Sequence, residues 1–340
     1  MALLWVGLYL IKEINDESEM LKPILSNNME EMINKNSSIF ISIIIPVFND
    51  PGGIRDTLST LVCQDYPANS FEIIVADNGS TDDTLDVIKE FIDKYPDLIY
   101  LVVENKIQSS YAARNIGIES SRGSVIAFID ADMSVKSDWL TKIDQSFKEN
   151  KWDYLACAVD IYLKNKSIYG LYNKITGFPI KKYVNEGHYA PTCCLVVRKA
   201  IFDELGLFDS KLIGGGDGEF GTRVYQSGRK LYFDPAIVMM HPARSSFKGL
   251  FNKYFRIGRG NFQLTVRHPD RFKGLRKVYL NPLHYMPNIP WFLSMQKSKS
   301  DIWHELSFVD KTKVLLIDWM MRLIRNMGYF YEKLYRRLDL

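Results

Sequence analysis

Two carboxylates separated by one small residue form the most chemically suggestive pattern in this sequence. Asp130 and Asp132 flank Ala131 directly after the apolar run of residues 125–129. Acids held this close repel each other unless a cation neutralises them, and carboxylate oxygens are ligands that Mg²⁺ and Mn²⁺ accept. A sparse protein ligand set leaves coordination positions free for a diphosphate. The triplet therefore predicts a divalent cation site, although short acidic triplets also recur in ordinary loops.

The elements around these acids alternate between continuous apolar runs and segments with helical periodicity. The apolar runs cover residues 41–48, 71–76, 99–103 and 125–129, and the helical segments cover residues 54–63, 84–92, 111–118 and 139–147. This alternation predicts a parallel sheet covered by helices on both faces. Asp77, Asp130 and Asp132 then fall at the C-terminal ends of strands, where ligands bind in open α/β sheets. Asp82 and Asp83 come just before a helical segment, so we expect them to cap it.

Length and composition set the organisation of the chain. Its 340 residues are 46% hydrophobic, which is enough for one α/β core with a smaller element appended. We predict an N-terminal extension over residues 1–38, an α/β domain over 39–245 and a helical region over 246–340. The turn after the first apolar run carries neither Gly-x-Gly-x-x-Gly nor a Gly-Lys-Ser/Thr motif, which disfavours dinucleotide oxidoreductases and P-loop enzymes.

Basic residues concentrate toward the C-terminus. Residues 246–340 hold 18 Lys and Arg against 7 Asp and Glu, and residues 1–245 hold 25 against 33. A basic region on an acidic body predicts peripheral contact with an anionic membrane surface, with a solvated helical face as the alternative. No nucleic-acid-binding motif accompanies the basic residues, so we expect no nucleic-acid partner.

Two segments of this basic region have helical spacing. Residues 247–260 interleave basic and aromatic side chains. In residues 314–338, polar residues fall near one helical face: Asp318, Arg322, Arg325, Lys333 and Arg336. The second segment is too charged to span a bilayer. Its sequence fits a helix in the membrane interface and a helix packed on the α/β domain equally well.

The cysteines indicate the compartment. None of the four belongs to a Cys-x-x-Cys pair, and Cys193 and Cys194 are adjacent, which disfavours a disulfide framework. A reducing environment fits best, so we expect a cytoplasmic protein at the inner face of the cell membrane.

Six motifs, in this order, resemble those of the inverting family-2 glycosyltransferases, which have the GT-A fold. They are Ser42–Asn49, Val75–Asp82, Ala113–Gly117, Ile129–Asp132, Pro191–Arg198 with Gly206–Asp209, and Gly214–Phe220. The resemblance implies an α/β, Rossmann-like fold with a mostly parallel central sheet flanked by helices and a C-terminal helical extension. It also implies transfer of a sugar from a nucleotide-sugar donor, with UDP-sugars expected first, to an acceptor hydroxyl.

The resemblance implies that the donor base binds at the first two strands. The backbone of Pro46, Val47 and Phe48 would line the base pocket, and Phe48 would stack on the base. Asp77 and Asn78 would contact base and ribose. Many relatives carry a second acid where this chain has Asn78, whose amide offers both a donor and an acceptor to a base edge.

The resemblance also implies contacts to the donor phosphates and a metal. Arg114 and Arg244 would lie against the nucleotide and its diphosphate, with surface roles as the alternative. Asp130 and Ala131 would contact the donor as well. The metal, Mn²⁺ or Mg²⁺, would be held by Asp130, Asp132 and His241. A lone His is more often structural, and it is the family position of His241 that favours the ligand role.

Inverting transfer requires a base that takes the proton of the acceptor hydroxyl. The resemblance implies that Asp217 is this catalytic residue, in a glycine-rich loop that lets the backbone approach substrates. Glu219 is the alternative base, and its other roles would be to orient the acceptor or to cap a helix that begins near Phe220. Gly216 stands where many relatives carry a Glu, so the usual pair of acids is absent.

The acceptor is expected to be a glycan or a lipid-linked sugar in the synthesis of surface polysaccharide or glycolipid. Two other functions stay open. A sugar nucleotidyltransferase would share the sheet and the metal-binding acids, but the basic glycine-rich loop expected after its first strand is missing. A catalytically inactive carbohydrate-binding scaffold is suggested by Asn78 and Gly216.

Overall fold

The computed structural model describes residues 38–296 and 301–338. Residues 40–340 form one compact unit, to which the following description refers. The extension predicted for residues 1–38 lies almost entirely outside the described residues.

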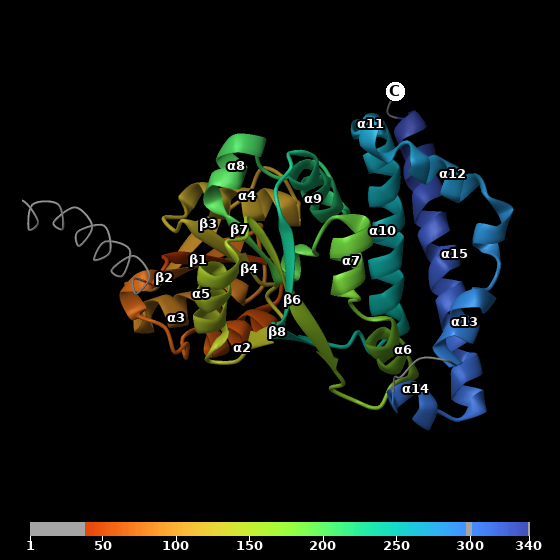
Figure 1. Cartoon of the computed structure of the whole chain (residues 1–340), viewed down its shortest axis with the longest axis horizontal. Coiled ribbons are helices and arrows are strands. Elements are labelled where there is room, and N and C mark those ends of the chain that lie inside the picture. Colours follow the sequence, from red (N-terminus) through yellow and green to blue (C-terminus); the bar gives the residue numbers. More distant parts are fainter. Residues whose placement is uncertain (1–37, 297–300, 339–340) are drawn as a thin grey trace, which may run out of the picture. The chain divides into compact units, whose positions relative to one another are not determined.

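An eight-stranded sheet forms the centre of this unit (Figure 1), in the order β3-β2-β1-β4-β7-β6-β8-β5. The strands are β1 (Ile41–Val47), β2 (Phe71–Asp77), β3 (Ile99–Val103), β4 (Val125–Phe128), β5 (Ser134–Val135), β6 (Tyr154–Tyr162), β7 (Leu195–Arg198) and β8 (Leu231–Pro242). Strands β3, β2, β1 and β4 are parallel, as are β6 and β8, whereas β7 and β5 run antiparallel to their neighbours. The predicted α/β fold with a mostly parallel sheet is confirmed.

Helices follow each of the first four strands in sequence. They are α2 (Pro51–Leu61), α3 (Thr84–Lys94), α4 (Ser110–Ser120) and, after β5, α5 (Trp139–Asn150). The Asp50 side chain caps α2 by accepting from Gly53 N, and the Ser109 side chain caps α4 by accepting from Tyr111 N. Strands β2 and β4 are buried along their whole length, which explains their uninterrupted apolar sequence.

Four further helices connect the second half of the sheet. They are α6 (Ile168–Thr176), α7 (Ile180–Gly187), α8 (Lys199–Leu205) and α9 (Gly216–Gln226). The C-terminal region continues with α10 (Phe247–Arg267), α11 (Pro269–Phe272), α12 (Gly274–Leu280), the 3₁₀ turn η3 (Pro282–Tyr285), α13 (Ile289–Gln296), α14 (Asp301–Glu305) and α15 (Phe308–Leu338). Among the described residues, no helix is long and apolar enough to cross a membrane.

Helices α10 and α15 cross at two glycines. A Cβ atom on Gly258 would lie 1.9 Å from the carbonyl oxygen of Arg325, and one on Gly328 would lie 2.2 Å from that of Phe255. Only glycine permits this approach of the two backbones. Near the crossing, Glu332 of α15 accepts hydrogen bonds from two side chains of α10. The long C-terminal helix is therefore packed firmly on α10.

Helix α10 also joins the C-terminal region to the sheet domain. A Cβ atom on Gly260 would lie 2.4 Å from the carbonyl oxygen of Gly214, and Gln263 Oε1 accepts from Ile213 N at 3.0 Å. One face of α10 thus lies directly on the loop before α9. The division at residue 245 stays a prediction about domain organisation.

Candidate active site

A pocket of about 430 Å³ is lined by residues from α4, the turn after β4, the start of α9, the end of β8, and α10. Five of the predicted site residues line it: Arg114, Asp130, Asp217, His241 and Arg244. Asp132 lines a neighbouring pocket of about 470 Å³, and Arg244 borders both pockets. The structure therefore gathers residues that are more than 100 positions apart in the sequence.

The pairing of β5 with β8 brings Asp132 to His241. Ser134 pairs with Met240 in antiparallel register, so the residues just before β5 lie beside the end of β8. His241 Nε2 lies 3.9 Å from Asp132 Oδ1. In an octahedral site with ligands about 2.1 Å from the ion, neighbouring ligands are about 3.0 Å apart and opposite ligands about 4.2 Å. The separation fits two ligands of one cation.

The imidazole of His241 is in the tautomer that a metal requires. Its Nδ1 lies 2.7 Å from the carbonyl oxygen of Pro242, which can only accept, so Nδ1 carries the proton. In the neutral ring, Nε2, on the side of Asp132, then offers its lone pair to a metal. Burial raises the pKa of Asp132, and Asp130 adds to this while His241 opposes it. The two side chains form a site that fits a divalent cation.

Asp130 has a different partner. Its Oδ1 lies 2.6 Å from Arg114 Nη2, and Arg114 is buried. In the part of the chain that the structure describes, no group of three or more His, Cys, Asp or Glu side chains is arranged to hold a metal. The structure thus brings together two of the three predicted ligands and leaves Asp130 in an ion pair.

Asp77 offers an unused acceptor at the end of β2. Its Oδ2 accepts from the backbone N–H groups of Gly79 and Ser80 at 2.9 and 3.0 Å. Its Oδ1 is buried and has no hydrogen-bond partner among the described residues. A buried carboxylate oxygen without a donor is costly, so a ligand N–H would stabilise it. Phe48, at the end of the neighbouring strand, is 47% exposed, as a stacking platform must be.

The other residues predicted to bind the donor lie apart from the two pockets. Val47 and Ala131 are buried and Pro46 is partly buried, and none of them lines either pocket. Asn78 Nδ2 donates to the carbonyls of Glu104 and Ile107 at 3.0 and 2.9 Å. Both amide protons of Asn78 are thus used within the protein, so the amide fixes a loop and presents no free donor to a base.

Asp217 lies in the first turn of α9, beside Tyr111. The Tyr111 hydroxyl accepts from Gly216 N at 2.8 Å and lies 3.4 Å from Asp217 Oδ1, to which it donates. Burial raises the pKa of Asp217, while the charges of Arg114 and Arg256 act in the opposite direction. A raised pKa makes the carboxylate a stronger base.

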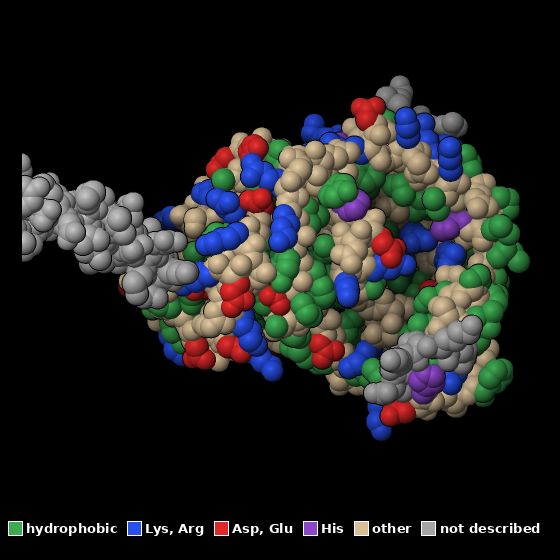
Figure 2. Space-filling view, viewed as in Figure 1, with side chains coloured by type: hydrophobic (Ala, Val, Ile, Leu, Met, Phe, Trp, Pro, Cys, Tyr) green, Lys and Arg blue, Asp and Glu red, His purple; other side chains and the backbone are tan. Residues whose placement is uncertain are grey.

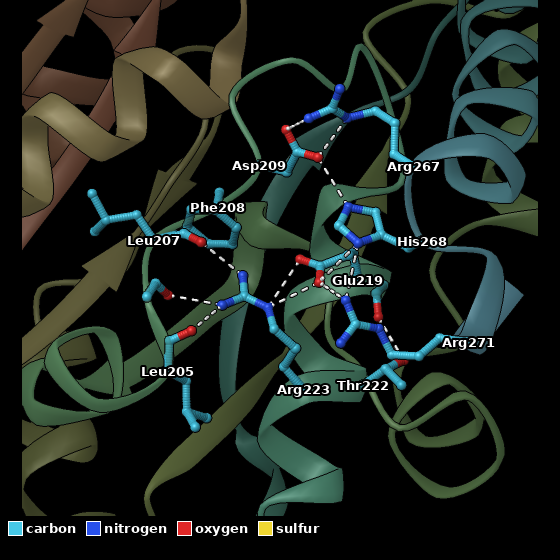
Figure 3. Close-up of polar contacts among 12 residues, drawn as sticks. Leu205, Leu207, Phe208, Asp209, Glu219, Thr222, Arg223, Arg267, His268 and Arg271 are labelled. Atoms are coloured by element: carbon cyan, nitrogen blue, oxygen red, sulfur yellow. Dashed lines mark hydrogen bonds and ion pairs between the residues drawn. The ribbon is translucent and has the colours of Figure 1, made fainter.

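Glu219 is separated from the pocket. Helix α9 begins at Gly216 and not near Phe220, so Glu219 falls within its first turn, where it is 1% exposed. Figure 3 shows its carboxylate held by Arg223 and Arg271, with His268 beside them. Arg223 also donates to the carbonyls of the segment 205–207. Glu219 therefore holds α9 against its neighbours, and it does not line this pocket.

Several pocket residues were not predicted from the sequence. They are Tyr111, Phe178, Tyr183, Tyr189, Lys253, Arg256 and Asn261. Three of them, on α10, belong to or follow the segment in which basic and aromatic residues interleave. The spacing of basic and aromatic residues in this segment could have indicated a binding role, but it did not indicate which face of the helix would line the pocket.

The chain is similar to known sugar transferases. The model of the family "Glycosyl transferase family 2" matches residues 42–206. Glycosyltransferase AglE of Haloferax volcanii is 32% identical over 294 residues, which are 85% of this chain and 94% of AglE. A dolichyl N-acetyl-alpha-D-glucosaminyl phosphate 3-beta-D-2,3-diacetamido-2,3-dideoxy-beta-D-glucuronosyltransferase of Methanococcus voltae is 30% identical over 269 residues, 73% of this chain and 78% of that protein.

Solved structures share the fold. Mannosyltransferase PcManGT from Pyrobaculum calidifontis, in complex with GDP-Man and Mn²⁺, superposes with a TM-score of 0.60 at 16% identity, over 88% of both chains. Residues 1–349 of S. aureus TarS, in complex with UDP-GlcNAc, give a TM-score of 0.51 at 18% identity, over 88% of this chain and 92% of that one. At these identities the likeness supports the GT-A architecture alone.

Proposed function

We propose that this chain, which belongs to glycosyl transferase family 2, transfers a sugar from a nucleoside diphosphate donor to an acceptor hydroxyl with inversion at the anomeric carbon. The observation that carries the proposal is the shared pocket, which His241, Asp130 and Arg244 border together with Asp217. Groups suited to hold a diphosphate therefore lie near a carboxylate suited to take a proton.

Asp217 would act as the base. It would take the proton of the acceptor hydroxyl while the hydroxyl oxygen bonds to the anomeric carbon and the nucleoside diphosphate departs from the opposite face. The Tyr111 hydroxyl and the backbone of α9 hold the carboxylate in place. Attack and departure on opposite faces account for inversion.

The leaving diphosphate would lie near Asp132, His241 and Arg244. Mn²⁺ or Mg²⁺ held by Asp132 and His241, and by Asp130 if it left Arg114, would supply positive charge to the diphosphate. Arg244 borders both pockets, and its guanidinium matches phosphate oxygens. Lys164 is a second cation of the pocket that Asp132 lines.

The donor base would bind at the ends of β1 and β2. Phe48 would stack on it, and Asp77 Oδ1 would accept a base N–H such as that of uracil. We expect UDP-sugars first, with dTDP- and GDP-sugars next. The two neighbouring solved structures contain GDP-Man and UDP-GlcNAc, so the fold accepts either base.

The acceptor would be lipid-linked, in the synthesis of a surface glycan at the cytoplasmic face of a membrane. The name of the M. voltae relative contains a dolichyl N-acetyl-alpha-D-glucosaminyl phosphate, which is a lipid-linked sugar. In this chain, α12, η3, α13 and α15 leave large apolar side chains outside, among them Leu280, Leu283 and Phe308, which are 70%, 75% and 80% exposed. Figure 2 shows hydrophobic side chains along this outer edge, with Lys and Arg beside them over α12. Such a surface supports peripheral membrane contact.

The experiment is a binding panel. UDP, dTDP and GDP are titrated into the wild type with Mn²⁺, with Mg²⁺ and with EDTA, and into Asp132→Ala and Asp77→Asn. We expect one nucleotide to bind only in the presence of metal. Asp132→Ala should abolish this metal-dependent binding. Asp77→Asn should weaken the binding of the nucleotide with one base more than that of the others. Failure of every nucleotide to bind with either metal would leave the inactive scaffold as the function to pursue.

A further inference from the structure

Lys253 and Arg256 are two pocket cations that the transfer step above does not use. They lie three residues apart on α10, and Ile257, Asn261 and Leu264 continue the same pocket-lining face of the helix. Neither cation forms an ion pair with an acidic side chain of residues 38–296 or 301–338. A cation that lines a pocket without an acidic partner is a candidate for binding a ligand anion.

The surroundings of Lys253 favour an anion strongly. Burial lowers its pKa to about 8, and the charges of Arg244 and Arg256 add to this effect. Its Nζ lies 5.2 Å from the centre of the Phe178 ring. An ammonium group that is shielded from water and repelled by two guanidinium groups gains more from a bound anion than an exposed lysine does.

The charges around the pocket are unbalanced on the α10 side. Four cations line the pocket, Arg114, Arg244, Lys253 and Arg256, against two acids, Asp130 and Asp217. Asp130 is already paired with Arg114. Arg244 also borders the neighbouring pocket that Asp132 lines, where the donor diphosphate is proposed to bind. Lys253 and Arg256 therefore account for the excess positive charge of the pocket that also holds Asp217, the proposed base.

Part of the pocket wall is apolar. Phe272 and Leu275 line it. Leu275 belongs to α12, whose later residues Val278 and Leu280 are exposed, followed by Leu283 on η3. The two cations thus belong to the same pocket as the carboxylate of Asp217, and one apolar residue of its wall lies on the helix that carries the exposed Val278 and Leu280.

We propose that Lys253 and Arg256 bind a phosphate group carried by the acceptor, so that the substrate is a phosphate-linked sugar and not a neutral glycan. This inference rests on the proposed function and names its acceptor class. The acceptor phosphate keeps all its bonds during transfer. The new bond joins the acceptor oxygen to the donor sugar, the bond broken is that to the leaving nucleoside diphosphate, and the proton goes to Asp217.

The test measures phosphate binding after the donor site has been filled. The full chain is first saturated with Mn²⁺ and the nucleotide that binds best in the panel above. Geranyl phosphate, inorganic phosphate and geraniol are then titrated calorimetrically into the wild type, Lys253→Met and Arg256→Gln. Lys248→Met is the matched control, because Lys248 is exposed on α10 and lines neither pocket.

We expect geranyl phosphate to bind the nucleotide-loaded wild type and geraniol not to bind. Each pocket variant should weaken geranyl phosphate by about tenfold or more, the loss of one charged hydrogen bond, while the nucleotide Kd stays within about twofold and Lys248→Met behaves as the wild type. If inorganic phosphate binds as tightly as geranyl phosphate, the phosphate group of a free sugar phosphate is sufficient for binding. If inorganic phosphate binds more weakly than geranyl phosphate, the ligand is a lipid phosphate.

Three results would overturn the inference. Geranyl phosphate could displace the nucleotide, or the variants could lose the nucleotide itself, and either would assign the two cations to the donor. Geraniol could also bind as well as geranyl phosphate. A wild type that binds geranyl phosphate but no nucleotide would instead reject the proposed function, so the two failures are distinguishable.

Discussion

The hydroxyl of Tyr111 lies 3.4 Å from Oδ1 of Asp217 while it accepts the backbone N–H of Gly216 at 2.8 Å. One side chain of α4 therefore fixes the start of α9 and the carboxylate that follows it. Tyr111→Phe removes this hydroxyl without removing the ring. We expect turnover to fall about threefold to tenfold, because a net hydrogen bond contributes about 0.5–1.5 kcal/mol. The nucleotide Kd should not change.

The same substitution should shift the pH profile. The Tyr111 hydroxyl donates to Asp217 and so favours its charged form. Its loss raises the pKa of Asp217 further, and the acidic limb of kcat should move to higher pH. A profile that keeps its position while kcat falls would mean that Tyr111 acts on the fold alone.

The packing of the Tyr111 ring explains why position 216 is a glycine. A Cβ atom on Gly216 would lie 2.7 Å from Cζ of the Tyr111 ring. Gly216→Ala should therefore displace the ring and cost about 1–3 kcal/mol of stability together with most of the activity. Gly218→Ala, in the same helix and with open space at its Cβ position, is the control. Equal thermal denaturation midpoints and activities for the two variants would contradict this relation.

Much of the fold was predictable because it is local. The four apolar runs from Ile41 onward became β1 to β4 nearly residue for residue, and the acids after them fell at strand ends as expected. Other features depend on contacts between distant segments. The ion pair that anchors Glu219 depends on Arg271 of α11, which lies 52 residues further along the chain.

The part of the pocket wall that α10 contributes could not be predicted for the same reason. Lys253 and Arg256 reach the pocket because α10 lies on the loop before α9, where Gly260 meets Gly214. No spacing within 247–260 specifies that contact. The approach of Asp132 to His241, the two proposed metal ligands, likewise depends on the register of β5 with β8.

The crossing of α10 and α15 should be sensitive to a single methyl group. Gly258→Ala places a Cβ atom 1.9 Å from the carbonyl oxygen of Arg325, so the helices must separate. We expect a loss of about 1–3 kcal/mol in the free energy of unfolding, measured by urea denaturation. Gly274→Ala, whose Cβ position is open, should change it by less than about 0.5 kcal/mol. An unchanged midpoint for Gly258→Ala would contradict the close packing.

The exposed stripe on α15 gives a membrane prediction. Buried positions of α15 face α10 and α6, whereas Leu316, Met320, Leu323, Met327, Tyr331 and Leu334 are exposed at helical spacing. Leu323→Glu combined with Met327→Glu should reduce sedimentation with anionic liposomes by about tenfold or more, since each apolar side chain contributes about 1.5–3 kcal/mol when buried. Leu163→Glu, an exposed position of similar size outside this region, is the control. Equal bound fractions for the two variants would exclude the stripe as a membrane contact.

Burial raises the pKa of Asp217, and this sets the direction of two effects. A base must be deprotonated, so activity should be lost as pH falls through a value above the usual Asp range. A carboxyl whose pKa is higher in the folded than in the unfolded state binds protons more readily when folded. Its ionisation therefore lowers the free energy of unfolding at pH values above the usual Asp range. Asp217→Asn should therefore leave the thermal denaturation midpoint at neutral pH unchanged or higher.

The most direct measurement is single-turnover transfer by the wild type and Asp217→Asn, with metal, donor and acceptor all saturating. If Asp217 is the base, the variant should bind metal and nucleotide with wild-type affinity and transfer sugar about 10²- to 10⁴-fold more slowly. Transfer by Asp217→Asn within about twofold of the wild-type rate would contradict the assignment and with it the mechanism proposed for this pocket.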